Sequence, residues 1–130
     1  MLLGRNAKNA YANTQINANA AVSNSFELNA MLHKRLDTEL DVLAHAIETK
    51  DFEKKAKAAQ KIIDILITLD ASLDLELKEP LIENIHQLYE HSISSVFSAS
   101  KDMDLERLAG VKKVLTDLKE GWEGLLEQVR

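Results

Sequence analysis

Apolar side chains recur every three or four residues along most of the chain after residue 24, which is the spacing of one face of an α-helix. The first series is Leu28, Leu32, Leu36, Leu40, Leu43 and Ile47. Asn24 precedes this series, and Glu27 lies three residues after Asn24, as in a helix N-cap with its capping-box partner. We therefore predict a first helix at residues 25–48.

Three further series with the same spacing predict three more helices. Asp51 is the expected N-cap of a helix that runs to about residue 74. Pro80 suits the first turn of a helix that ends near residue 100, because the N–H that proline lacks would have no partner there. Asp102 and Asp104 both offer caps to a last helix that extends to residue 129. Leu66 and Leu88 are predicted core residues.

Four helices joined by short turns pack most simply as an antiparallel up-down bundle, so the predicted fold is an all-α four-helix bundle. A chain of 130 residues fits one domain, residues 1–130, with the bundle at 25–130. Residues 5–24 are dominated by Asn and Ala. We expect residues 1–24 to form an N-terminal arm or short helix.

The second and third predicted helices carry more apolar surface than a bundle needs. On a projection of about 100° per residue, the apolar residues of the second helix span roughly 200°, about twice the width of a bundle seam. Ile63 and Ile67 lie at one edge of this arc, and Ile93 and Phe97 lie on one flank of the third helix. Either the arm or two buried faces absorb the excess, or these four residues line a groove for an amphipathic partner segment, with the arm as a displaceable lid.

Composition narrows the functional classes. Lys plus Arg total 16 against 21 Asp plus Glu, a net charge of −5, which disfavours generic binding to nucleic acid or anionic membrane. The chain contains no cysteine, which is compatible with a reducing compartment. Its apolar runs are too short for a signal peptide or for membrane insertion. We expect a cytoplasmic protein.

No catalytic or cofactor motif is present. Glu83 and His86 form a single E-x-x-H pair, whereas metal sites of ferritin-like bundles need two such pairs and two further carboxylates. No His is followed three residues later by Lys, the residue that marks the reactive His of a histidine phosphotransfer bundle. The four glycines form no phosphate-binding loop. We expect no enzyme activity, no metal and no cofactor.

Several short motifs occur in a fixed order along the chain. The first is Leu69-Asp70-Ala71-Ser72-Leu73-Asp74, followed by Asn84, Ile85, Leu88 and Tyr89. Others are Leu28, Met31 and Leu32, and near the end Val114, Leu115, Leu118, Glu120 and Trp122. They resemble the L-x-x-S-L-D, N-L-x-x-L-Y, L-x-x-M-L and L-L-x-x-L-x-x-x-W patterns of the flagellin-specific export chaperone family, FliS.

The resemblance implies a function. Members of this family are cytoplasmic chaperones that bind the disordered C-terminal segment of flagellin, prevent premature polymerisation and deliver the subunit to the cytosolic domain of the flagellar type III export gate. Tyr11 and Ile16 look like the family's N-terminal segment, which folds over the bundle and moves when flagellin binds, so both are candidate partner-binding residues. The alternative is an adaptor of the same fold that binds a flagellar regulator or co-chaperone.

The chain departs from the family pattern at several positions. His33-Lys34-Arg35 replaces Tyr-Asp-Gly, Lys78-Glu79 replaces the Gly-Gly before the third helix, and His91 replaces a second Tyr. These departures predict an altered connection between the second and third helices, and they are compatible with a divergent paralogue or with an altered client.

Overall fold

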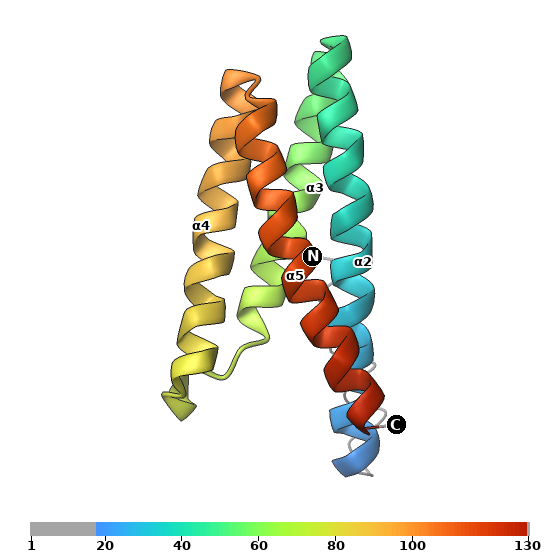
Figure 1. Ribbon diagram of the computed structural model, residues 1–130, viewed down its shortest axis with the longest axis vertical. Coiled ribbons are helices and arrows are strands. Elements are labelled where there is room, and N and C mark those ends of the chain that lie inside the picture. The colour runs from blue at the N-terminus through green and yellow to red at the C-terminus, as the bar shows by residue number, and fades with distance from the viewer. Residues whose placement is uncertain (1–17, 130) are drawn as a thin grey trace.

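The computed structural model describes residues 18–129 (Figure 1). It contains α2 (Ala18–Thr49), α3 (Phe52–Ala71), the short 3-10 helix η1 (Leu75–Leu77), α4 (Pro80–Asp102) and α5 (Leu105–Val129). Each long helix runs antiparallel to the one before it, so the chain passes up, down, up and down the bundle. The predicted all-α four-helix bundle is confirmed. Within the described residues no helix has the length and apolar character needed to span a membrane.

The start of α2 differs from the prediction. The helix begins at Ala18 rather than at residue 25, so Asn24 and Ser25 lie inside it, and the proposed capping box at Asn24 is wrong. Residues 18–22 are mostly alanine, the residue with the highest helix propensity, and extending an existing helix costs little compared with nucleating one. A cap motif alone therefore did not mark the end of this helix.

The other helix ends follow local chemistry. The Asp51 side chain accepts a hydrogen bond from the backbone N–H of Lys54 at 3.1 Å, as an N-cap should. Pro80 is the first residue of α4, as predicted. Asp104 accepts from the N–H of Arg107 at 3.0 Å, whereas Asp102, the other expected cap, is the last residue of α4. The second helix ends at Ala71, three residues before the predicted end.

All three connections between the long helices contain a non-glycine residue in the left-handed region. These are Lys50, Lys78 and Met103, with φ values of 56°, 53° and 55°. Glycine is the usual residue here because it has no Cβ to clash with the backbone. Lys78 occupies a position where the resemblance leads us to expect glycine, so the altered 2–3 connection keeps a conformation that glycine adopts more easily.

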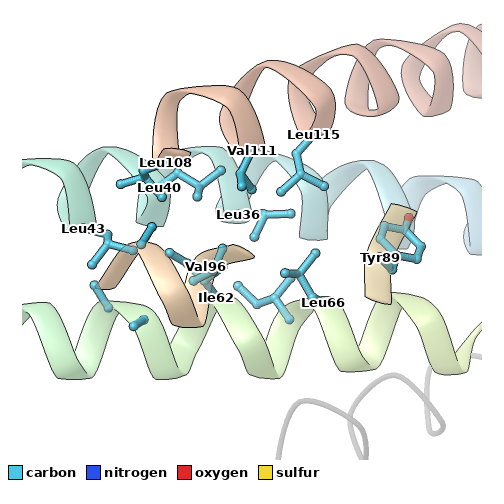
Figure 2. Packing of buried hydrophobic residues seen from close by; sticks show 14 of the residues in the cluster. Leu36, Leu40, Leu43, Ile62, Leu66, Tyr89, Val96, Leu108, Val111 and Leu115 are labelled. Atoms are coloured by element: carbon cyan, nitrogen blue, oxygen red, sulfur yellow. The ribbon is translucent and has the colours of Figure 1, made fainter. Parts of the chain in front are cut away.

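The core consists of aliphatic side chains from all four long helices together with Tyr89 (Figure 2). Its buried members include Leu32, Leu36, Leu40, Leu43, Ile47, Ile62, Ile65, Leu66, Leu69, Tyr89, Val96, Ala99, Leu108, Val111 and Leu115. Leu66 is fully buried, as predicted. Leu88 is 37% exposed, so its assignment to the core is wrong. At this level of α4 the neighbouring Tyr89 points inward instead, because its large ring fills the space between α2 and α5.

The four helices do not pack equally against one another. α2 packs extensively against α3 and α5, and α3 against α4, whereas α4 and α5 contact one another least. In Figure 1, α5 starts beside the upper end of α4 and crosses toward the lower end of α2. Lys112 pairs with Asp41, and Lys119 lies 3.9 Å from Asp37, so ion pairs accompany the α2–α5 contact. The α4–α5 side of the bundle is consequently more open.

Candidate partner-binding surfaces

The four candidate groove residues lie on adjoining flanks of α3 and α4. Ile63 and Ile67 are one turn apart on α3, and Ile93 and Phe97 are one turn apart on α4. Asp70 lies one turn beyond Ile67 on its flank, and His86 lies two turns before Ile93 on the other. The Asp70 carboxylate is 2.6 Å from His86 Nδ1, so the two flanks adjoin. We call the surface formed by Ile63, Ile67, Ile93 and Phe97 the α3–α4 face.

Exposure divides these four residues into two pairs. Phe97 is 61% exposed and Ile67 is 49% exposed, and the two lie on adjoining flanks of α3 and α4. Ile63 and Ile93 are partly buried and pack against the core. The described helices therefore leave much of the Ile67 and Phe97 side chains uncovered. Tyr11 and Ile16, the other two candidate residues, lie outside the described residues.

A histidine between two carboxylates marks the lower end of the α3–α4 face. His86 Nδ1 lies 2.6 Å from Asp70 Oδ1, and His86 Nε2 lies 2.6 Å from Glu90 Oε1. The hydrogen bond to Asp70 raises the pKa of His86, with further contributions from the charges of Asp70 and Glu90, against some desolvation. No set of three side chains suited to hold a metal ion is found over the described residues.

Lys55 ties α3 to the opposite, upper end of α4. Its Nζ donates a hydrogen bond to the carbonyl oxygen of Ser100 at 2.8 Å and lies 3.5 Å from the sulfur of Met103. It also lies 5.4 Å from the centroid of the Phe52 ring. A cation suits this position because the C-terminal carbonyls of a helix carry partial negative charge. The two ends of the α3–α4 face therefore differ in charge.

A second surface lies on the opposite flank of α4, where sequence reasoning placed none. It is an open groove of about 440 Å³ between α4 and α5, lined by Leu88, His91, Ser92, Ser95, Arg107, Gly110, Val111 and Val114. Leu88 and Val114 are its exposed apolar side chains. The available signal was the small size of Ser92, Ser95 and Gly110, which leaves the space between the helices unfilled.

A chain of hydrogen bonds joins α2, α4 and α5 inside the bundle, near the lower end of the groove side. The Trp122 indole N–H donates to the Tyr89 hydroxyl at 3.2 Å, and that hydroxyl lies 2.8 Å from His33 Nε2. Because the Tyr89 hydroxyl has one proton and accepts from Trp122, we assign it as the donor to a neutral His33. Burial lowers the pKa of His33 to about 4, with a smaller effect from the charge of Lys119.

Comparisons with known proteins agree with the motifs. The sequence description of the family named "Flagellar protein FliS" matches residues 6–129. The chain is also similar to the flagellar secretion chaperone FliSB of Pseudomonas aeruginosa, with 28% identity over 119 residues, covering 92% of this chain and 94% of the relative. The likeness thus extends over nearly the whole length of both chains.

Proposed function

The chain belongs to the FliS family of flagellar proteins, and on that premise we propose that it is a cytoplasmic flagellar secretion chaperone that binds the C-terminal segment of flagellin. It holds this segment until it passes the subunit to the cytosolic domain of the export gate, and so prevents premature polymerisation. Tyr11 and Ile16 take part in binding, as the family resemblance implies. The function requires no catalysis and no cofactor.

The observation that carries this proposal is the exposed apolar α3–α4 face. Ile67 leaves 49% and Phe97 61% of its surface in water, next to the partly buried Ile63 and Ile93. A partner helix that presents apolar side chains at helical spacing would cover all four residues at once. A disordered segment that folds as it binds gains the apolar burial needed to offset its ordering entropy.

Truncation of flagellin tests the client. We expect the full-length chain to co-elute with flagellin from the same organism in size-exclusion chromatography, as a stoichiometric complex. Flagellin that lacks its C-terminal segment should elute separately, because the segment that becomes helical on the chaperone is missing. Undiminished complex formation with the truncated flagellin would show that binding uses another region.

A charge placed on the α3–α4 face tests the binding surface. Phe97→Asp should weaken flagellin binding by roughly ten-fold or more in titration calorimetry, since an exposed aromatic anchor becomes a carboxylate. Met31→Asp is the matched control, because Met31 is also exposed but lies on α2. Circular dichroism should show both variants folded. If Phe97→Asp unfolds the protein, or binds as tightly as Met31→Asp, Phe97 is not a contact residue.

The groove between α4 and α5 favours a second candidate, an adaptor that binds a flagellar regulator or co-chaperone. Leu88 and Val114 expose apolar surface there, on the flank of α4 opposite Phe97. This candidate gains support if flagellin fails to bind at all while a purified flagellar regulator or co-chaperone does bind, and Val114→Asp abolishes that complex.

A further inference from the structure

We infer that the partner segment docks on the α3–α4 face as a helix with its N-terminal end at the Asp70–His86–Glu90 cluster and its C-terminal end near Lys101. The docked helix would then run parallel to α4 and antiparallel to α3. This inference rests on the proposed function, and it adds the direction of the bound segment. It follows from the length of the apolar face and from the charges at its two ends.

The apolar face has the length of a short helix. Ala56 and Ala71 are both exposed on α3, at its two ends, and Ile63 and Ile67 lie between them. Fifteen residues at 1.5 Å per residue separate the two alanines, which is about 22 Å. A docked helix of about four turns therefore reaches from one charged end of the face to the other.

The lower end of the face is acidic whatever the charge of His86. Asp70 and Glu90 each lie 2.6 Å from the imidazole, so a protonated His86 neutralises only one of the two carboxylates. Glu83 lies one turn before His86 on α4 and is exposed. Lys78 is the single Lys or Arg between residues 70 and 90.

The upper end of the face is neutral to basic. Lys101 is exposed and lies one turn beyond Phe97, and no ion pair is found for it within the described part of the chain. Lys55 adds a second cation, held at the end of α4 by Ser100. The acidic groups at this end of α3 are Asp51, which caps the helix through the N–H of Lys54, and Glu53, which pairs with Lys57 at 3.1 Å.

The peptide dipoles of a helix leave partial positive charge at its N-terminus and partial negative charge at its C-terminus. With its N-terminal end at Asp70 and Glu90 and its C-terminal end at Lys101, the docked helix places each of its partial charges next to groups of opposite charge. The reverse direction places the negative end of the helix against two carboxylates and the positive end against the Lys101 ammonium group. The apolar contacts are nearly the same in both directions, so the charges decide between them.

Cross-linking tests the direction, because the natural chain contains no cysteine. Ala71→Cys places a thiol at the lower end of the face and Ala56→Cys places a matched thiol at the upper end. The probe is the shortest flagellin C-terminal peptide that binds, prepared with a cysteine at either its N- or its C-terminus. We expect the N-terminal thiol to couple to Ala71→Cys at least about five-fold faster than to Ala56→Cys, and the C-terminal thiol to show the opposite preference, because proximity raises the effective concentration.

The outcomes separate this inference from the function on which it rests. If neither the peptide nor full-length flagellin binds, the proposed function fails. If flagellin binds but the preference is reversed, the inferred direction is wrong while the function stands. If flagellin binds and both thiols couple equally or not at all, the partner does not lie along this face in one direction, and the inference is also overturned.

A neutral substitution tests the charge argument separately. Glu90→Gln should weaken peptide binding roughly two- to five-fold at about 50 mM salt, with the difference fading near 0.5 M salt as the charges are screened. Glu120→Gln on α5 is the matched control, being an exposed glutamate away from the face, and should bind as the natural chain does. Equal affinities for the natural chain and Glu90→Gln at low salt would overturn the role given to the acidic end.

Discussion

At the scale of single residues, a chain of hydrogen bonds links the partly buried Trp122 to the buried side chains of Tyr89 and His33. Each hydrogen bond inside a protein contributes modestly, but a buried donor or acceptor that loses its partner costs considerably more. His33 stands where the resemblance leads us to expect tyrosine, and it meets Tyr89 across the bundle with the ring centroids 5.8 Å apart. The departure at this position therefore coincides with an interaction between α2 and α4.

The low pKa of His33 predicts a loss of stability in acid. The unfolded chain takes up a proton near the ordinary value of 6.5, whereas the folded chain resists protonation down to about 4. The contribution of neutral His33 to the free energy of unfolding is therefore complete above pH 6.5. It is lost as the pH falls from 6.5 to 4, by about 3 kcal/mol in total. Urea unfolding at a series of pH values measures this loss.

Two variants isolate the effect from that of other titrating groups. His33→Gln removes the titrating group, so its stability should change less between pH 7 and pH 4 than that of the natural chain. His45→Gln alters an exposed histidine of the same helix and should keep the natural pH dependence. A His33→Gln curve parallel to that of the natural chain would contradict the assignment.

Removing the shared hydroxyl should expose its cost directly. Tyr89→Phe keeps the ring in the core but removes the hydroxyl that hydrogen-bonds with the Trp122 N–H and with His33 Nε2. We expect the free energy of unfolding to fall by about 1–3 kcal/mol. Denaturant unfolding followed by the fluorescence of the single tryptophan measures it, and a change below about 0.5 kcal/mol would show that the bonds do not form.

At the scale of elements, the connection between α3 and α4, like the other two connections, holds a non-glycine residue in the left-handed region. Lys78 adopts φ of 53°, where a side chain costs roughly 1–2 kcal/mol and glycine costs none, although glycine loses more entropy on folding. Lys78→Gly should therefore raise the free energy of unfolding by up to about 1 kcal/mol. Glu79→Gly is the control, since Glu79 has φ of −76°, and it should not stabilise. Equal effects of the two variants in urea unfolding would rule out relief of backbone strain.

α4 is the element on which both surfaces depend. Its inward side contributes Tyr89, Val96 and Ala99 to the core, while Phe97 faces the α3–α4 face and Leu88 faces the groove toward α5. Because α4 buries mainly its inward side, both of its flanks can contact other molecules. The short contact with α5 is what leaves the second flank accessible.

At the scale of the whole molecule, the packing of the helices determines how much each leucine contributes to the free energy of unfolding. Leu66 is enclosed by neighbouring helices, and Leu66→Ala should destabilise the protein by about 2–5 kcal/mol. Leu88→Ala should cost about 1 kcal/mol or less, because water already reaches this side chain in the groove. Parallel urea titrations measure both values, and similar losses would mean that α5 closes the groove in solution.

The sequence by itself determined the number and order of the bundle helices, the fold class and the family. The helices and the fold class depend on periodic burial and on short turns, both of which are local patterns that survive in a single sequence. The family came from the resemblance of the ordered motifs. It also identified Asp51, Pro80 and Asp104 at helix ends, because capping involves residues only a few positions apart. It misplaced the start of α2, because alanine propensity extended the helix past a plausible cap.

Only the tertiary structure decided which apolar residues face water. Leu88 and Tyr89 are neighbours in sequence, and the helical pattern favoured Leu88 for the core, yet Tyr89 is the buried one because His33 and Trp122 meet its hydroxyl. The groove between α4 and α5 depends on how far two helices diverge, and their own sequences do not specify that angle. It is determined by packing against a third helix, α2, to which ion pairs and apolar contacts hold α5.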